Sequence, residues 1–146
     1  MWALADRAGL DLNSPYAYVM WAEYHSATSI VAEADGELVG FVTGFRVPGS
    51  PDTVFVWQIA VDERQRGAGI GGRMLDELVG RTGAQSIEAT VTPDNAASAA
   101  MFRALGARHD GDVEETLAFE EQLFPEGHEA EIRYRVPVNA NDKQRD

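Results

Sequence analysis

One apolar run, at residues 53–61, limits the possible folds of this chain more than any other feature. Its sequence is TVFVWQIAV, which is apolar almost throughout. A strand with one solvated face alternates polar and apolar side chains, whereas a strand covered on both faces is continuously apolar. We therefore expect residues 53–61 to form the central strand of a sheet that other elements cover on both sides.

Helical and extended segments alternate around this strand, with glycine and proline between them. We expect a short helix closed at Gly9 and a second helix of about ten residues capped by Ser14, with Pro15 at its first position. The sequence also predicts a hairpin of strands 29–34 and 38–46 with Asp35-Gly36 at its turn, a loop at 47–51, a helix at 69–81, a strand at 86–92, a helix at 95–105 and a last strand at 129–138. The helical spacing on the second helix joins Tyr16, Val19, Met20 and Tyr24.

This alternation predicts an α/β (α+β) fold with a central mixed sheet flanked by helices. With 146 residues the chain has room for one domain, which we expect at residues 1–138, followed by a polar tail at 139–146 that we expect to be disordered. The first helix has the features of a helix end, so we expect it to begin before Met1.

Composition excludes several classes of protein. No stretch approaches the roughly 18 apolar residues of a membrane span. The first residues do not form a basic segment followed by an apolar one, so we expect no secretory signal. The chain has no cysteine, which excludes disulfides, thiol catalysis and thiolate metal ligands, and its three histidines lack ligand spacing. We expect a cytoplasmic protein without a metal.

The charge is strongly acidic, with 12 Lys and Arg against 24 Asp and Glu and a net charge of −12. Such a surface repels phosphate backbones, so we expect neither nucleic acid nor an anionic membrane as a partner. The charge fits a small or cationic partner. It also fits a chain adapted to salt, and net charge alone does not choose between the two.

A glycine-rich turn follows the central strand and opens a helix, with the sequence RQRGAGIG at residues 64–71. Glycines let the backbone approach a ligand, and N–H groups at a helix N-terminus hold an anion. Arg64, Arg66 and Arg73 add local positive charge. The turn therefore predicts a pyrophosphate site, although a glycine turn is often only a tight turn. It has neither the lysine of a Walker loop nor an acidic ribose partner on the next strand.

Arg64-x-x-Gly67-x-Gly69 after the strand end Ile59-Ala60-Val61 resembles the acetyl-CoA signature of the Gcn5-related N-acetyltransferases (GNAT). The segment from Thr92 to Ala107, with Asn95 and Phe102, is similar to a second segment of that superfamily. The resemblance implies the GNAT acyl-CoA N-acyltransferase fold and acetyl-CoA as co-substrate. It implies cofactor contacts at Ile59, Ala60, Val61, Arg64, Arg66, Gly67, Ala68, Gly69, Ile70, Gly71, Asn95 and Phe102.

Further blocks narrow the resemblance to the L-2,4-diaminobutyrate acetyltransferases of ectoine biosynthesis. They include Asn13-Ser14-Pro15-Tyr16, the strand segment from Val56 to Val61, and His128-Glu129-Ala130-Glu131, and they extend over residues 11–136. The resemblance implies transfer of acetyl from acetyl-CoA to the 4-amino group of L-2,4-diaminobutyrate, which gives N4-acetyl-L-2,4-diaminobutyrate and CoA. It also implies a homodimer.

The transfer needs a neutral amine. A side-chain ammonium has a pKa of about 10.4, so at pH 7 only about one molecule in a few thousand is the nucleophile. Glu131 is the first candidate for the base, with His128 as a second participant. The structural alternatives are pairing of Glu131 with Arg133 or Arg135, and a hydrogen-bonded structural His128. The thioester carbonyl would be polarised by backbone N–H groups around Ile59 to Val61.

Selectivity between two amines requires that the α-carbon end of the substrate be fixed. We expect Asp11 to hold an ammonium and Asn13, Tyr16 and Trp57 to contribute to the same pocket, the indole facing a cation. The alternatives are helix capping around Ser14 and a purely structural core role for Trp57. For Asn95, the alternative to a cofactor contact is a cap of the helix that begins there.

Phe102 departs from the superfamily pattern, because many members carry a tyrosine there that protonates the departing thiolate. A water, Tyr16 or Tyr134 would have to serve, or the thiol, with a pKa of about 8.5, leaves as the thiolate. Two other functions remain open on the sequence: acetylation of another small amine or of a protein amine, and a CoA-binding module without catalysis, which Phe102 alone favours.

Overall fold

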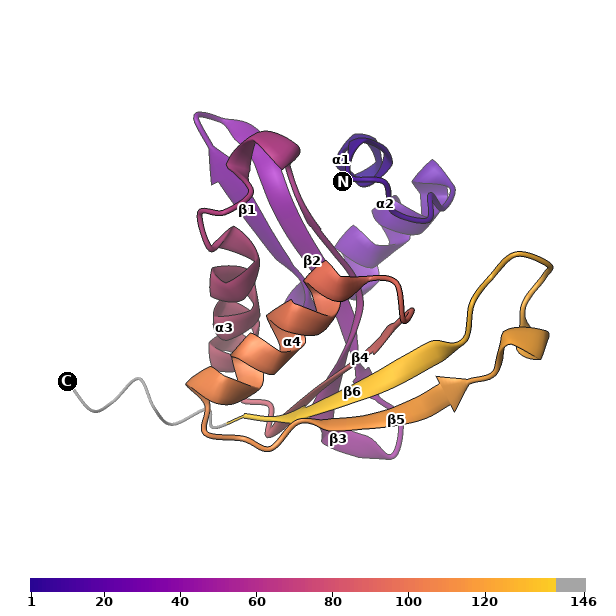
Figure 1. Ribbon diagram of the computed structural model, residues 1–146. Coiled ribbons are helices and arrows are strands. Elements are labelled where there is room, and N and C mark those ends of the chain that lie inside the picture. Colours follow the sequence, from indigo (N-terminus) through magenta and orange to yellow (C-terminus); the bar gives the residue numbers. More distant parts are fainter. Residues whose placement is uncertain (139–146) are drawn as a thin grey trace.

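The computed structural model describes residues 1–138, and the expectation for the tail at 139–146 lies outside them (Figure 1). A six-stranded sheet has the order β1-β2-β3-β4-β6-β5. Its strands are β1 (Ile30–Ala34), β2 (Glu37–Val47), β3 (Ser50–Val61), β4 (Ser86–Val91), β5 (Glu114–Phe119) and β6 (Glu131–Pro137). All neighbours are antiparallel except β3 and β4, so the sheet is mixed, as the sequence predicts.

Helices cover both faces of this sheet. The helices are α1 (Trp2–Arg7), α2 (Pro15–Tyr24), α3 (Ile70–Thr82) and α4 (Ala96–Arg108), and three short 3₁₀ turns are η1 (Ser26–Thr28), η2 (Glu63–Gln65) and η3 (Glu121–Leu123). Figure 1 shows α3 and α4 side by side over one face, where they share the main core with Val54 and Val136. A second, smaller core joins α1 and α2 to Phe41 and Ala60 on the opposite face.

Local signals explain most of the element boundaries. Ser14 caps α2 by accepting from the Ala17 N–H, and Asn95 caps α4 by accepting from the Ser98 N–H. Asp35 and Gly36 both have positive φ, which suits a two-residue hairpin turn. The expected loop at 47–51 is shorter than predicted, because β2 and β3 pair up to Val47 and Ser50.

The prediction of the apolar face of α2 is wrong. The side chains that α2 buries are Tyr18 and Trp21, whereas Tyr16, Val19 and Tyr24 are 74%, 66% and 78% exposed. The sequence PYAYVMWAEY is apolar on more than one side, so helical spacing does not decide which side packs on the sheet.

Two irregularities in β3 create the space for a site. The ladder between β3 and β4 covers only the pairs from Thr53↔Ser86 to Phe55↔Glu88, while β4 continues along β6 as far as Val91↔Ile132. A β-bulge also interrupts the pairing of β2 with β3 between Thr43 and Gly44. The central strand therefore separates from β4 over its second half.

Candidate active site

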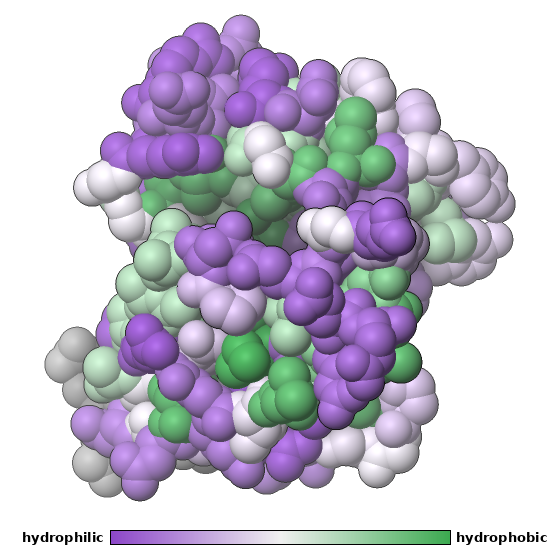
Figure 2. Space-filling model, turned by 45° about the vertical axis from the view of Figure 1, so that its right-hand side comes forward, coloured by the Kyte–Doolittle hydropathy of each residue, from purple (hydrophilic) through white to green (hydrophobic). Residues whose placement is uncertain are grey.

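The separation of β3 from β4 opens a cleft of about 1090 Å³. One wall carries Ile59, Ala60 and Val61 of β3, and the other carries Thr90 and Val91 of β4. A smaller cavity of about 140 Å³ adjoins it and is also lined by β3 and β4. In the space-filling view, the upper half of the molecule has a hollow with apolar surface inside a hydrophilic rim (Figure 2).

The glycine-rich turn forms one end of this cleft. Gly67 and Gly69 have φ of +83° and +73°, a left-handed conformation that L side chains rarely adopt. Helix α3 begins directly after Gly69, which has no side chain to cap the first N–H groups. Gly71 also approaches Met101 of α4 so closely that a Cβ would lie 2.8 Å from the Met101 methyl carbon. The turn thus presents unblocked backbone N–H groups at a helix N-terminus, which is where anions bind.

The three arginines predicted at this turn differ in their positions. Arg66 lines the cleft, whereas Arg64, Arg73 and the neighbouring Ala68 do not. Arg64 instead donates from Nε and Nη2 to the two carboxylate oxygens of Asp62, at 3.1 and 3.0 Å. Asp62 is 4% exposed, and the hydrogen bonds from Arg64 hold the pKa of this carboxyl well below its usual value. The local basic patch that faces the cleft is therefore smaller than the sequence suggests.

Glu131 and His128 lie together at the opposite side of the cleft, and both line it. Glu131 Oε1 is 3.6 Å from Nε2 of His128, and Glu131 Oε2 is buried without a hydrogen-bond partner among residues 1–138. Among residues 1–138, Glu131 pairs with neither Arg133 nor Arg135, the two predicted alternatives, and Arg135 forms its ion pair with Glu88, at 2.6 Å. A buried carboxylate oxygen without a partner is costly, so it points to a group that binds there.

The environment of Glu131 changes its acidity. Burial raises the pKa of Glu131 above its ordinary value, and the negative charge of Asp11 raises it further, while the hydroxyl of Thr90 and the imidazole of His128 lower it. A carboxylate with a raised pKa is a stronger base than an exposed one.

His128 is held from two sides. Its ring stacks on Phe124 with 4.0 Å between centroids, and its Nδ1 is 2.6 Å from the backbone oxygen of Glu129. Because a carbonyl only accepts, Nδ1 carries the hydrogen and Nε2 is the nitrogen that faces Glu131. The hydrogen-bonded His128 that the sequence left as an alternative is therefore found, and it directs the ring at the carboxylate.

The residues predicted to bind substrate are divided between the cleft and the surface. Asp11 lines both cavities, and Trp57 lines the smaller one, where it stacks on Trp21 at 4.7 Å. Asn13 lines neither cavity; its side chain donates to the Asp11 carbonyl. Tyr16 lies on the exposed side of α2 and also lines neither cavity, so the structure does not bring it to the other predicted residues.

Asn95 and Phe102 are placed by α4. Asn95 lines both cavities while its side chain caps the helix, so its capping alternative is found as well. Phe102 is 2% exposed and borders the smaller cavity. Tyr134, one of the alternative acids, is buried against Phe102 with 6.3 Å between ring centroids and lines neither cavity.

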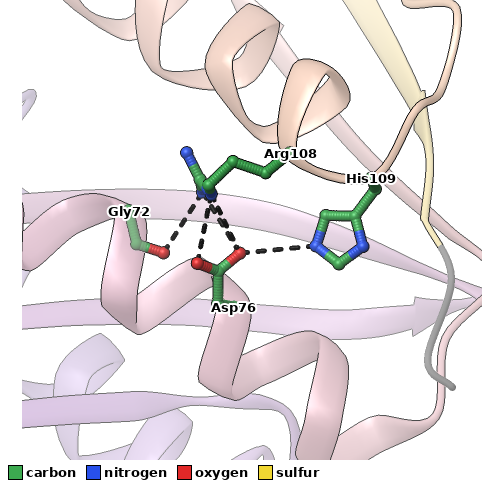
Figure 3. Close-up of polar contacts among 4 residues, drawn as sticks. All are labelled: Gly72, Asp76, Arg108 and His109. Carbon is green, nitrogen blue, oxygen red and sulfur yellow. Dashed lines mark hydrogen bonds and ion pairs between the residues drawn. The ribbon is translucent and has the colours of Figure 1, made fainter. Parts of the chain in front are cut away.

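A polar cluster joins the first half of α3 to the end of α4 (Figure 3). The carboxylate of Asp76 on α3 accepts from Arg108 Nε at 3.1 Å and lies 3.4 Å from Nε2 of His109 at the end of α4. Arg108 also donates to the backbone oxygen of Gly72 at 3.4 Å. This cluster connects the first half of α3, which follows the glycine-rich turn, to the end of α4.

Several residues that line the two cavities escaped the sequence interpretation, among them Gln58, Thr90 and Asp94. Asp94 accepts from the Thr92 hydroxyl at 2.6 Å, and its hydrogen bond with Glu129 raises the pKa of Glu129. Thr90 and Gln58 lie within predicted strands, and no local pattern distinguishes either from a structural strand residue.

Among residues 1–138, no three His, Asp or Glu side chains lie close enough to hold a metal ion together. In the same part of the chain, no helix has the length and apolar character needed to cross a membrane.

Comparison with known proteins agrees with this geometry. Residues 2–107 match the acetyltransferase (GNAT) family. The chain is 45% identical over 140 residues to an L-2,4-diaminobutyric acid acetyltransferase of Halalkalibacterium halodurans, covering 93% of this chain and 74% of the relative. It is 43% identical to the protein of that name in Nocardia farcinica, with coverage of 97% and 76%.

Solved structures are similar as well. Diaminobutyrate acetyltransferase EctA from Paenibacillus lautus, in complex with its substrate L-2,4-diaminobutyric acid and coenzyme A, has a TM-score of 0.89 and 37% identity, and the match covers 93% of this chain and 86% of that one. The ribosomal-protein-S18-alanine N-acetyltransferase of Escherichia coli has a TM-score of 0.72 at 20% identity, with coverage of 94% and 85%, which shows the shared fold alone.

Proposed function

Because the chain belongs to the L-2,4-diaminobutyric acid acetyltransferases of the GNAT family, we propose that it transfers the acetyl group of acetyl-CoA to the 4-amino group of L-2,4-diaminobutyrate. The products are N4-acetyl-L-2,4-diaminobutyrate and CoA, and the reaction is a step of ectoine biosynthesis. The observation that carries the proposal is the cleft between β3 and β4, which has an anion-binding helix start at one end and the buried, unpartnered oxygen of Glu131 at the other.

Acetyl-CoA would lie along the separated strands. The glycine-rich turn and Arg66 would hold its pyrophosphate, and the pantetheine arm would follow the edge of β3 beyond Phe55, where the ladder with β4 ends. There, backbone N–H groups near Ile59, Ala60 and Val61 would donate to the thioester oxygen as charge develops on it. No side chain has to supply that stabilisation.

Glu131 would remove the proton from the 4-ammonium. Its Oε2 is buried and has no hydrogen-bond partner in the described part of the chain, and its raised pKa makes proton transfer from an ammonium less unfavourable. His128, 3.6 Å away, would orient the carboxylate and tune its pKa. The neutral amine then attacks the thioester carbon and the C–N bond forms. The nitrogen gives its second proton to water in the cleft as the C–S bond breaks and the thiolate of CoA leaves.

Discrimination between the two amines would rest on Asp11 and Trp57. Asp11 lies at the edge of both cavities, and its charge acts on Glu131, so the two carboxylates share one cleft. Diaminobutyrate carries two ammonium groups, and two separated carboxylates match them, one binding the α-ammonium and one deprotonating the other. Asn13 would act through the Asp11 carbonyl, which its side chain contacts.

The departing thiolate needs no tyrosine from this chain. Phe102 has no hydroxyl, and Tyr16 and Tyr134 line neither cavity. A thiol with a pKa of about 8.5 leaves as a thiolate at modest cost, and water in the open cleft can protonate it. The Phe102 position therefore does not argue against catalysis.

We also propose a cytoplasmic homodimer. The net charge of −12 suits a salt-rich cytoplasm and attracts a substrate with two ammonium groups. The apolar side chains that α2 exposes, Tyr16, Val19 and Tyr24, offer a surface that a second copy could cover. Light scattering of the purified chain tests the dimer, and a monomer at all concentrations would contradict it.

The test of the activity is a steady-state assay of CoA release with diaminobutyrate, ornithine, lysine, spermidine and a lysine peptide as acceptors. We expect the highest kcat/KM for diaminobutyrate, and NMR of the product should place the acetyl group on the 4-nitrogen. Turnover with another amine but not with diaminobutyrate would replace this substrate, and acetyl-CoA binding without turnover on any amine would favour the non-catalytic module.

A further inference from the structure

Gln58 occupies an unusual position in the central strand. Across the bulge, Thr43 pairs with Gln58 and Gly44 pairs with Val56, so Trp57 has no partner residue on β2. The extra residue interrupts the alternation of side chains, and Trp57 and Gln58, although adjacent, both contact α2. Trp57 stacks on Trp21, and Gln58 bonds to Tyr18.

The side-chain amide of Gln58 joins two other elements. The Tyr18 hydroxyl donates to Gln58 Oε1 at 2.9 Å, and Gln58 Nε2 donates to the backbone oxygen of Asp11 at 2.9 Å. A backbone carbonyl only accepts, so it fixes the amide nitrogen toward Asp11 and leaves the amide oxygen for the tyrosine. Glutamine thus offers a donor and an acceptor in one rigid planar group, and both are used.

Tyr18 is the buried and tightly packed end of this chain of hydrogen bonds. It is 4% exposed, and its ring packs edge-on against Phe41 in the smaller core, with 6.2 Å between centroids. Asp11, by contrast, lies in the loop between α1 and α2, outside any helix or strand, and its side chain is exposed. The hydrogen bonds therefore connect a rigid, buried residue to a loop residue at the edge of the cleft.

We infer that Gln58, held by Tyr18, is a positioning residue that sets the place of Asp11 for the non-reacting ammonium of diaminobutyrate. This inference rests on the proposed function and adds to it the residue that fixes the amine-binding carboxylate. Gln58 borders the smaller cavity together with Asp11, next to the space where the substrate would lie. Removing its amide would leave Asp11 in the chain but free the loop that carries it.

The test compares Gln58→Met and Tyr18→Phe with the wild-type chain. Methionine keeps the length of glutamine without its donor and acceptor, and phenylalanine keeps the packing of Tyr18 without the hydroxyl. We expect the KM for diaminobutyrate to rise about tenfold in Gln58→Met and about threefold in Tyr18→Phe, as expected for the loss of ordinary hydrogen bonds. The KM for acetyl-CoA and the kcat should each change by less than about twofold.

Matched controls are Gln85→Met and Tyr24→Phe. Gln85 is exposed in the connection before β4, and Tyr24 is 78% exposed on the same helix as Tyr18. Both variants should leave every constant at the wild-type value. Thermal melting of each variant checks the fold, and Tyr18→Phe keeps the inference testable if Gln58→Met melts early.

A double-mutant cycle with Asp11→Asn separates positioning from a structural role. If Gln58 acts through Asp11, then Gln58→Met should raise the KM for diaminobutyrate by less than about twofold in the Asp11→Asn background. Additive effects in the cycle, or equal rises of both KM values, would overturn the inference while leaving the activity in place. A wild-type chain that does not acetylate diaminobutyrate would instead overturn the proposed function and the inference with it.

Discussion

Nε2 of His128 lies 3.6 Å from Oε1 of Glu131, and the second oxygen of the same carboxylate is buried without a hydrogen-bond partner among residues 1–138. One side of the carboxylate is thus oriented by a ring that Phe124 and the Glu129 carbonyl hold in place. We propose that the substrate ammonium binds at this second oxygen, although the Thr90 hydroxyl also acts on the carboxyl and lowers its pKa. The arrangement suits a base that must accept a proton from a substrate, and it has a cost in stability.

Glu131→Gln should stabilise the fold at pH 8. Burial raises the pKa of Glu131, so the folded chain holds the proton more tightly than the unfolded chain does. Stability from this group is therefore lost as the pH rises from the unfolded pKa through the raised folded one, and above both values the charged form is a net cost. We expect a Tm higher by about 2–4 °C at pH 8, and no gain at pH 4. Glu126→Gln, an exposed change in the segment before β6, should not shift the Tm. A lower Tm for Glu131→Gln at pH 8 would contradict this reasoning.

His128→Gln should move the acidic limb of the pH profile of kcat/KM to higher pH. The electrostatic interaction with His128 lowers the pKa of Glu131, so its removal raises that pKa and the base becomes ionised only at higher pH. The measurement is kcat/KM for diaminobutyrate between pH 5 and pH 9, with saturating acetyl-CoA. A limb that disappears in this variant would show that His128 itself is the titrating base.

Arg66→Gln should raise the KM for acetyl-CoA by about five- to tenfold, because a charge-assisted hydrogen bond to a phosphate is lost. Arg73→Gln removes the same charge from an exposed side chain that does not line the cleft, so its KM should stay within about twofold of the wild type. Equal rises of the KM for acetyl-CoA in the two variants would mean that binding depends on the positive charge of this surface as a whole and not on a contact with Arg66. At two salt concentrations, Arg66→Gln should again raise the KM for acetyl-CoA more than Arg73→Gln does.

Asp76→Asn should lower the Tm without changing either KM by more than about twofold. The variant loses the ion pair with Arg108, at 3.1 Å, and weakens the junction of α3 and α4. For a partly exposed pair we expect a drop of about 2–4 °C. An unchanged Tm would show that the junction of the helices relies on apolar packing alone.

Signals that act over a few residues could be predicted from the sequence. The Ser14 and Asn95 caps, the Asp35-Gly36 turn and the glycine-rich turn each follow from the conformation or hydrogen bond of one residue, and each is found. The central strand followed from its apolar run, which ordinary burial explains.

Features that depend on partners distant in the sequence could not be predicted. The buried face of α2 is chosen by Phe41 and the strands beneath it, and its own residues are apolar on several sides. The bulge that turns Gln58 toward Tyr18 arises from the register with β2, which the sequence of β3 does not contain. Arg64 has a near partner in Asp62, but only the fold shows that this carboxylate is buried and takes the guanidinium away from the cleft.

The catalytic role of Glu131 is the central claim, and turnover by Glu131→Gln with binding measured in parallel tests it most directly. Glutamine keeps the size of the side chain but cannot accept the proton, so we expect kcat for diaminobutyrate to fall by about a hundredfold or more. Calorimetry should give a Kd for CoA within about twofold of the wild type, because Glu131 lies away from the glycine-rich turn. A Glu131→Gln chain that acetylates diaminobutyrate at a rate close to the wild type, with CoA still bound, would contradict the account.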